Sequence, residues 1–307
     1  MEYHNSKFQI SNFKFQIQLY APAKINIGLL VKERLASGYH KIETIMVPIK
    51  LFDTLVVKRK DNGVFFKSDA KQLPIKSNLV VKAADLFFRE SKIKGGADIF
   101  LEKKIPIGAG LGGGSSDAAQ TLLGLNIIYG KPLSIDKLHK LATKIGMDVP
   151  FFLHTRSAVA TNLGEKLKFI NIPKLKIILY SPNFGISTKW AYAAIQNSKF
   201  KIQNLSQSAG LTDGDFSLKI LIKKLINNDL PDINAFVVNS FESLVFSKYP
   251  ALLAMKNKLL AYGVYSASLS GSGSSVFGLV DNRNIVKVKN RLNKDHIKAI
   301  FTESLNE

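Results

Sequence analysis

Short alternating stretches of apolar and polar residues dominate the beginning of the chain. Between residues 13 and 58 this alternation, mixed with apolar runs, predicts several strands, among them 24–30 and 44–48. Residues 77–92 instead repeat their apolar side chains at helical spacing, which predicts a helix. A further strand is expected at residues 97–102, immediately before a glycine-rich stretch.

Helical and strand patterns alternate through the rest of the chain. The last four predicted elements, strands 265–269 and 275–280, a helix at 284–292 and a strand at 296–301, form a split β-α-β pattern of ferredoxin-like type. The other helices are expected at residues 115–129, 134–145, 216–226 and 251–262 and from residue 188 onward, and the other strands at 157–161 and 175–181.

Two segments stand apart from these patterns by their polar, weakly repetitive composition. The sequence Ser6-Lys-Phe-Gln-Ile returns, with one change, as Ser198-Lys-Phe-Lys-Ile. We interpret residues 1–13 as a low-complexity N-terminal arm and residues 197–214 as a polar surface insertion.

The composition narrows the class of protein. A chain of 307 residues with 46% hydrophobic residues can bury a substantial core. Cysteine is absent, which excludes disulfides, thiolate metal sites and a cysteine nucleophile. No apolar run reaches the length of a membrane span, and the first residues lack the order of a signal peptide. We therefore expect a cytoplasmic protein.

The formal net charge of +20 raises the alternative of a nucleic-acid-binding protein. The lysines are scattered from Lys7 to Lys298, and no zinc-finger, helix-turn-helix or RNP-like signature accompanies them. A basic nucleic-acid-binding protein is therefore the less favoured interpretation, and binding of a polyanionic small molecule explains the charge more simply.

The glycine segment, residues 108–114, contains five glycines in seven positions and runs directly into a predicted helix. Glycine allows positive φ and close approach of the backbone to a ligand. A helix that begins near Ser115 would direct its unpaired N–H groups and the positive end of its dipole at an anion. The segment therefore predicts a phosphate-binding loop for a nucleotide.

Other glycine motifs fit this segment less well. Gly108, Gly110 and Gly113 match G-x-G-x-x-G, but a dinucleotide site also needs an acidic residue at the end of the next strand, roughly 20 residues on. Asp136 instead begins another helical pattern. A Walker A loop is excluded because no Gly-Lys-Ser/Thr follows, and a flexible linker would not lead into an amphipathic helix.

The longer stretch Ile105-Pro-Ile-Gly-Ala-Gly-Leu-Gly-Gly-Gly-Ser-Ser-Asp-Ala-Ala119 resembles the ATP loop of the GHMP kinases, the family named for galactokinase, homoserine kinase, mevalonate kinase and phosphomevalonate kinase. Further segments resemble the family's other motifs in the same order, so that the resemblance covers about residues 18 to 301. They are residues 21–29 with Gly38-Tyr-His40, residues 146–151 and residues 269–277.

The resemblance implies an α+β, GHMP kinase-like fold of two lobes. The N-terminal lobe, residues 14–165, would have a ribosomal protein S5 domain 2-like fold and bind ATP. The C-terminal lobe, residues 166–307, would be ferredoxin-like and bind the substrate.

The Gly-Tyr-His motif also implies a branch of the family. The expected activity is ATP-dependent phosphorylation of the 2-hydroxyl of 4-diphosphocytidyl-2-C-methyl-D-erythritol, in non-mevalonate isoprenoid biosynthesis, with ATP and Mg²⁺ as cofactors. A GHMP kinase that acts on another small alcohol is the alternative. The expected partners are ATP and the small-molecule substrate, with no specific nucleic acid and no membrane, in a monomer or weak homodimer.

Two charged residues are candidate catalytic groups. Lys24 and Asn26 alternate with isoleucines, so the two polar side chains share one face of the predicted strand. Asp148 follows a predicted helix, where the residues alone favour an N-cap for a short helix at 149–153. The resemblance instead implies that Asp148 is the general base, kept ionised by Lys24, which also stabilises charge on the attacking oxygen.

The substrate-binding positions depend on the resemblance. It implies that Tyr39 stacks on cytosine, that His40 hydrogen-bonds it and that Tyr192 supplies the second aromatic face. Ser37 and Asn183 depart from the family's pattern at turn positions, which concerns local loop geometry. The implied substrate-binding residues are Asn26, Tyr39, His40, Thr188, Tyr192, Gly271, Ser272 and Gly273.

The nucleotide-binding positions surround the glycine segment. Ser116 and Asp117 are candidates for assisting Mg²⁺, although Asp117 fits a helix-dipole role equally well, so the metal ligands stay open. The implied ATP-binding residues are Asn78, Lys103, Pro106, Gly108, Ala109, Gly110, Leu111, Gly112, Gly113, Gly114, Ser115 and Ser116.

Overall fold

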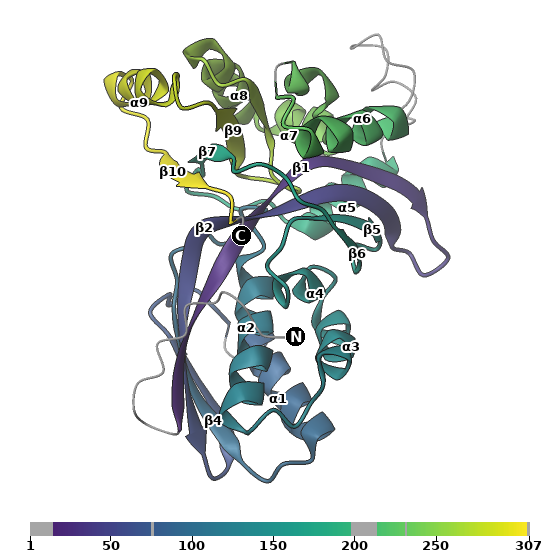
Figure 1. The fold of residues 1–307 in the computed structure, drawn as a ribbon, viewed down its shortest axis with the longest axis vertical. Coiled ribbons are helices and arrows are strands. Elements are labelled where there is room, and N and C mark those ends of the chain that lie inside the picture. Colours follow the sequence, from purple (N-terminus) through teal and green to yellow (C-terminus); the bar gives the residue numbers. More distant parts are fainter. Residues whose placement is uncertain (1–14, 75–76, 198–213, 231, 306–307) are drawn as a thin grey trace. The chain divides into compact units, whose positions relative to one another are not determined.

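The computed structural model describes residues 15–74, 77–197, 214–230 and 232–305 (Figure 1). The arm expected at residues 1–13 lies outside these residues, as does the insertion expected at 197–214 except for its two end residues. Packing of Cα atoms divides the chain into two compact units. Unit 1 comprises the chain up to Ala23, Leu51–Pro106 and Gly112–Thr155, and unit 2 comprises Lys24–Lys50, Ile107–Leu111 and Arg156–Glu307. The expected lobe boundary near residue 165 stays a prediction.

Two long strands, β1 (Gln16–Arg34) and β2 (His40–Lys60), each continue from one unit into the other. They contain the strands expected at 24–30 and 44–48 and extend well beyond them. In β1 every residue from Ala21 to Val31 is buried. A strand that is buried on both faces has a nearly continuous apolar run. The apolar and polar residues therefore stop alternating here although the strand does not end.

Unit 1 packs helices against its part of the sheet. Its further strands are β3 (Gly63–Ser68) and β4 (Gly96–Glu102), and its helices are α1 (Leu79–Ser91), α2 (Gly113–Ile128), α3 (Ile135–Ile145) and α4 (Val149–Phe152). β4 pairs antiparallel with the end of β2 and parallel with β3. All residues of α2 from Ser116 to Asn126 are buried. Gly124 permits this burial, because an added Cβ would lie 2.5 Å from the Leu19 side chain of β1.

Unit 2 contains a four-stranded antiparallel sheet of order β10-β7-β9-β8. Its strands are β7 (Lys176–Tyr180), β8 (Ser266–Leu269), β9 (Val276–Val280) and β10 (Ile300–Glu303). The beginning of β2 pairs with β5 (Ala158–Asn162), which pairs with β6 (Lys166–Phe169). The helices are α5 (Thr188–Asn197), α6 (Gly214–Ile226), the 3₁₀ helix η3 (Ile233–Phe236), α7 (Glu242–Lys248), α8 (Pro250–Tyr262) and α9 (Ile285–Lys294).

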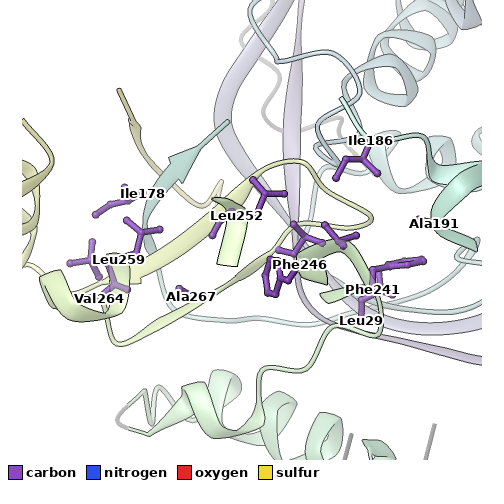
Figure 2. Packing of buried hydrophobic residues seen from close by; sticks show 14 of the residues in the cluster. Leu29, Ile178, Ile186, Ala191, Phe241, Phe246, Leu252, Leu259, Val264 and Ala267 are labelled. Atoms are coloured by element: carbon purple, nitrogen blue, oxygen red, sulfur yellow. The ribbon is translucent and has the colours of Figure 1, made fainter. Parts of the chain in front are cut away.

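One apolar cluster holds this unit together (Figure 2). Phe241 and Phe246 come from α7 and the residue before it, and they lie in the same cluster as Leu29 of β1. Leu252 and Leu259 bring α8 into it. Because each fully buried large side chain stabilises the fold by about 1.5–3 kcal/mol, this cluster contributes strongly to the unit's stability.

The expected α+β class and ferredoxin-like pattern are confirmed, with local differences. The strand expected at 296–301 begins only at Ile300, because α9 continues to Lys294 and His296 then turns the chain with a φ of 54°. The elements β3, β6, η3 and α7 were not predicted. Among the described residues, no helix combines the length and the apolar character needed to cross a bilayer.

Ion pairs surround the carboxylate of Glu303 in β10. Hydrogen bonds from lysine side chains lower the pKa of Glu303 from 4.5 to about 2. The folded state therefore favours the carboxylate, which adds stability at pH values above 4.5 and loses that contribution as the pH falls toward 2. The lysines are Lys174, at 2.7 Å, Lys176, at 2.8 Å, and Lys50.

We expect Glu303→Gln to make unfolding less sensitive to acid. Between about pH 7 and about pH 3 the wild type should lose more stability than the variant, because only the wild type must protonate this carboxylate against its lysines. Urea midpoints across this range measure the effect. Glu102→Gln, which removes a more exposed carboxylate that pairs with Lys104 alone among the described residues, is the control. An identical pH dependence in wild type and Glu303→Gln would contradict the prediction.

Candidate functional site

The glycine segment turns its carbonyl groups toward the rest of unit 2. Four successive carbonyls, those of residues 108–111, accept hydrogen bonds at 2.9–3.1 Å. The donors are, in chain order of the acceptors, the N–H of Ile186, the N–H of Ser275, the hydroxyl of Ser270 and the N–H of Lys24. Residues 269–277 therefore supply two of the four donors that hold the glycine segment in place.

Gly110 must be glycine in this arrangement. Its φ is +77°, and an added Cβ would lie 2.0 Å from the Ser270 carbonyl oxygen. Gly108 and Gly112 also have positive φ, of 68° and 71°, and the residues between these glycines do not. Alternation of left- and right-handed backbone directs successive N–H groups to one side and forms a concavity that binds anions.

Helix α2 begins at Gly113, two residues before the predicted start. Gly112 is its N-cap, with φ 71° and ψ 13°, and its carbonyl accepts the first helical hydrogen bond from Ser116 N–H at 2.9 Å. The N–H groups of Gly113, Gly114 and Ser115 therefore have no partner within the helix. Two of these three residues lack side chains, so a phosphate can approach the helix end closely.

Two polar atoms in the next residues of α2 are buried without a partner. Ser116 Oγ and Asp117 Oδ1 have no hydrogen bond within the part of the chain that the structure describes. Buried polar atoms are nearly always paired in native proteins, with protein, water or ligand. These two oxygens are therefore candidate contacts for a bound ligand or ion.

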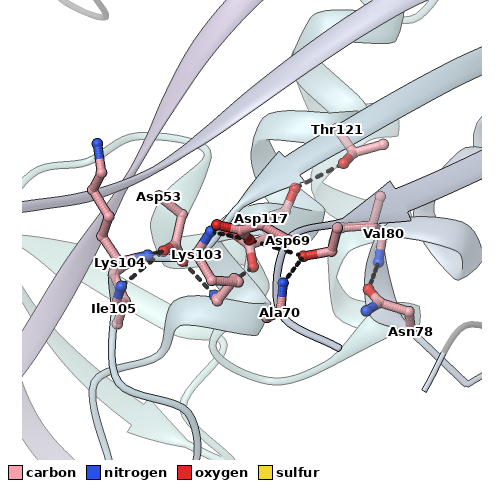
Figure 3. A network of polar contacts seen from close by, with 11 residues as sticks. Asp53, Asp69, Ala70, Asn78, Val80, Lys103, Lys104, Ile105, Asp117 and Thr121 are labelled. Atoms are coloured by element: carbon pink, nitrogen blue, oxygen red, sulfur yellow. Dashed lines mark hydrogen bonds and ion pairs between the residues drawn. The ribbon is translucent and has the colours of Figure 1, made fainter. Parts of the chain in front are cut away.

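Lys103 lies between two carboxylates in unit 1 (Figure 3). Its Nζ donates to Asp53 Oδ2 and, at 2.9 Å, to Asp117 Oδ2. Burial disfavours the ammonium ion, but the charges of Asp117 and Asp53 outweigh burial and raise the pKa of Lys103. Burial raises the pKa of Asp117 to about 7 against the opposing effect of Lys103. No sequence motif pointed to Asp53.

Asn78 and Asp148 both stand at the N-cap of a helix in unit 1, but only one of their side chains caps its helix. Asn78 caps α1, since its Oδ1 accepts a hydrogen bond from Val80 N–H at 2.9 Å. Asp148 occupies the N-cap position of α4 but makes no capping hydrogen bond. The N-cap position that the residues alone favour is therefore confirmed, without a capping hydrogen bond from the half-buried side chain, and the catalytic role of Asp148 stays a prediction.

Lys24 and Asn26 lie on one face of β1, as the alternation predicts, and are 4% and 3% exposed. Lys24 Nζ donates to Asn26 Oδ1, and Asn26 Nδ2 donates to Thr44 Oγ1 at 2.9 Å. Gly271 lies against both, because an added Cβ would be 3.3 Å from Asn26 Oδ1 and 3.4 Å from Lys24 Nζ. The structure thus brings the buried Lys24 ammonium, the Asn26 amide and Gly271 together in unit 2.

His40 stacks on Tyr192, with ring centroids 5.6 Å apart and planes inclined by 22°. Tyr192 in turn meets Phe241 edge to face. Burial and the charge of Arg34 lower the pKa of His40, so its ring is neutral at pH 7. Tyr39, the other predicted stacking residue, is 60% exposed.

The turn around Ser272 is held by side chains from outside it. Thr188 Oγ1 lies 3.1 Å from Ser272 Oγ, which connects two predicted substrate-binding residues. Asn239 donates to the carbonyls of Leu269 and Gly271 at 2.8 and 2.9 Å. Asn239 was not predicted, since it precedes a short helix without a recognisable motif.

Comparison with family models gives two matches. The model for the N-terminal domain of GHMP kinases matches residues 78–156, and the model for the C-terminal domain of GHMP kinases matches residues 221–298. The first covers the whole glycine segment and Asp148, and the second covers residues 269–277.

Individual proteins are similar over nearly the whole chain. A Staphylococcus aureus protein described as a candidate 4-diphosphocytidyl-2-C-methyl-D-erythritol kinase is 37% identical over 270 residues, 87% of this chain and 91% of that protein. A crystal structure of 4-(cytidine 5'-diphospho)-2C-methyl-D-erythritol kinase has a TM-score of 0.75 at 32% identity, covering 94% of this chain and 98% of that one. Homoserine kinase from Cytophaga hutchinsonii shares the fold, with a TM-score of 0.72 at 19% identity and 98% coverage of both chains.

We expect Gly112→Ala to weaken nucleotide binding far more than it weakens folding. A non-glycine residue at positive φ costs roughly 1–2 kcal/mol, and at this N-cap it also displaces the N–H groups offered to phosphate. Gly130→Ala is the matched control, because Gly130 has a φ of +79° with open space around it. Calorimetry with ATP should show at least about a tenfold loss of affinity for Gly112→Ala alone. Equal affinities of the two folded variants would contradict the phosphate-binding role.

Proposed function

The chain belongs to the GHMP kinase family and is a small-molecule kinase, and we propose that it transfers the γ-phosphate of ATP to the 2-hydroxyl of 4-diphosphocytidyl-2-C-methyl-D-erythritol. The observation that carries this proposal is the 37% identity, over 87% of the chain, to a relative described by that activity. A kinase for another small alcohol is the alternative. The cytoplasmic location and the monomeric or weakly dimeric state stay predictions.

The beginning of α2 suits a triphosphate. Phosphoryl transfer requires mainly alignment and charge stabilisation from the protein. The N–H groups of Gly113, Gly114 and Ser115 would bind phosphate oxygens, aided by the positive end of the helix dipole. Bound ATP would supply the phosphoryl group, and the glycine segment would orient it.

The residues present also fit a magnesium ion. Mg²⁺ prefers oxygen ligands and is commonly held by one or two protein oxygens together with phosphates and water. Ser116 Oγ and Asp117 Oδ1 are buried oxygens that lack partners within the described residues. The same residues contain no cluster of three or more His, Cys, Asp or Glu side chains suited to a metal. We therefore propose Ser116 and Asp117 as the residues that would hold Mg²⁺, which would neutralise phosphate charge.

Asp148 and Lys24 are the proposed catalytic residues. Asp148, which lies within the residues matched by the model for the N-terminal domain of GHMP kinases, would take the proton from the 2-hydroxyl. Lys24 is held by Asn26 and is almost fully buried, where a cation interacts strongly with nearby negative charge. It would stabilise charge that develops on the attacking oxygen.

The His40–Tyr192 pair supports recognition of a base. A neutral imidazole has one N–H donor and one acceptor, which can pair with the polar edge of cytosine. Tyr192 offers a ring whose orientation is fixed by Phe241, and exposed Tyr39 would cover the second face of the base. The Thr188–Ser272 pair would contact the substrate's phosphates.

We expect Asp148→Asn to reduce kcat by about 10²- to 10⁴-fold, because the amide cannot accept the proton. ATP affinity, measured by calorimetry, should stay within about twofold of the wild type. Asp136→Asn, an exposed residue in the first turn of α3, is the control and should retain full activity. More than about a tenth of wild-type kcat in Asp148→Asn would remove this residue from the role of base.

A substrate panel tests the specific reaction. The purified protein should phosphorylate 4-diphosphocytidyl-2-C-methyl-D-erythritol and leave mevalonate, homoserine and galactose unchanged. Tyr192→Ala should raise KM for the cytidyl substrate by about tenfold or more, with KM for ATP unchanged, since a stacking face is worth about 1–3 kcal/mol. Tyr192→Phe keeps the ring and should keep the KM. Turnover of mevalonate with none of the cytidyl substrate would overturn the proposed reaction while keeping the family.

A further inference from the structure

Asp53 is a fully buried carboxylate on β2 that belongs to none of the sequence motifs. Its Oδ1 accepts hydrogen bonds from two consecutive backbone N–H groups, those of Lys104 at 2.6 Å and Ile105 at 2.8 Å. Its Oδ2 accepts a hydrogen bond from Lys103 Nζ (Figure 3). One side chain thus holds three consecutive residues that lead into the glycine segment.

Lys103 also binds the beginning of α2, the helix that follows the glycine segment. The same Nζ donates to Asp117 Oδ2 at 2.9 Å, five residues after the N-cap of α2. The first residue of the helix also packs here, because a Cβ on Gly113 would lie 3.2 Å from Lys103 Nζ and 3.0 Å from Ile105 Cγ2. Within unit 1, the chain before the glycine segment and the helix after it are therefore held by one network.

The cost of this network argues for a role beyond stability. The side chains of Asp53, Lys103 and Asp117 are 0%, 7% and 3% exposed. Buried ion pairs are often no more stabilising than apolar side chains of the same volume, whereas their hydrogen bonds restrict geometry closely. What they restrict here is the position of the N–H groups at the start of α2.

We propose that Asp53 is a positioning residue for phosphoryl transfer. It orients Lys103 and the backbone of residues 104–105, and through them it fixes the first turn of α2 for the triphosphate. This inference rests on the proposed function, because it assumes that the helix end binds ATP. It adds to that function a residue that acts without touching the substrate.

Asp53→Asn tests the proposal. Asparagine keeps an oxygen for the N–H groups of residues 104–105 but removes the charge that faces Lys103. We expect the Kd of ATP, by calorimetry on the protein without its second substrate, and the KM for ATP to rise by about fivefold or more. The KM for the cytidyl substrate should stay within about twofold. A purely structural role would lower the urea midpoint and leave both KM values unchanged.

Asp69→Asn is the matched control. Asp69 is exposed, and its Oδ1 accepts a hydrogen bond from the backbone N–H of Lys103 at 2.9 Å. The variant removes one negative charge close to the same lysine without touching the buried network. It should leave the Kd of ATP and both KM values as in the wild type. A loss in Asp69→Asn equal to that in Asp53→Asn would assign the effect to general charge and overturn the proposal.

Asp53→Asn removes one of the two carboxylates that pair with the buried Lys103 ammonium, which can prevent the variant from folding. A second pair of variants covers that case. Asp53→Asn combined with Lys103→Met leaves no unpaired ammonium and is compared with Lys103→Met alone. Charge-assisted hydrogen bonds are roughly twice as strong as neutral ones, so residues 104–105 should be held less firmly and ATP affinity should fall by about threefold or more. Equal affinity in this pair, or an unchanged Kd in folded Asp53→Asn, would overturn the proposal.

The same experiments separate this inference from the proposed function. A wild-type protein that binds ATP without phosphorylating the cytidyl substrate would contradict the proposed reaction and leave the calorimetric comparison valid. A wild-type protein that does not bind ATP would overturn both.

Discussion

The chain's central constraint is the hydrogen bonding of backbone groups that belong to no helix or strand. An unpaired buried carbonyl costs about as much as a lost hydrogen bond, so the carbonyls of the buried residues Ala109 and Leu111 need donors, and those of Gly108 and Gly110 are paired as well. The donors are Lys24 in β1, Ile186 in the loop before α5, and Ser270 and Ser275 in the turn between β8 and β9. Three segments far apart in the sequence are thereby placed around the glycine segment within unit 2.

The same constraint explains why the glycines occur where they do. A side chain at Gly110 would collide with the Ser270 carbonyl, and Gly112 adopts a left-handed conformation to begin α2. The helix that follows is buried almost throughout, so its position is fixed by packing and its N-terminus cannot move freely. A well-packed helix with a glycine-lined first turn is suited to bind phosphate, because a preorganised site loses less free energy to ordering on binding.

Burying charged side chains costs free energy, and the buried charged residues gather at the candidate site. Lys24 and Lys103 are each held by side chains from their own unit, and both are almost inaccessible. Elsewhere, the Glu303 ion pairs lie nearer the surface, where solvent weakens them. This distribution fits an enzyme that keeps buried charged side chains at the site where a polyanionic substrate is expected.

The sequence alone determined the features that depend on neighbouring residues. The glycine run, the helical spacing of α1 and α3 and the shared face of Lys24 and Asn26 follow from local backbone geometry, and the structure agrees with each. The family motifs added the proposed catalytic and substrate roles. The helix start at Gly113 was missed, because glycine has a low helix propensity and only the tertiary contacts of α2 favour it there.

Only the tertiary structure identified Asp53 and Asn239. Asp53 meets Lys103 across 50 residues, and Asn239 meets Gly271 across 32. Neither residue belongs to a recognisable sequence pattern. Each is needed because backbone groups far away in the sequence, the N–H groups of residues 104–105 and the carbonyls of Leu269 and Gly271, require hydrogen-bond partners. The sequence therefore indicates which segment we expect to bind phosphate, whereas long-range hydrogen bonds, which no periodicity records, decide what holds that segment in position.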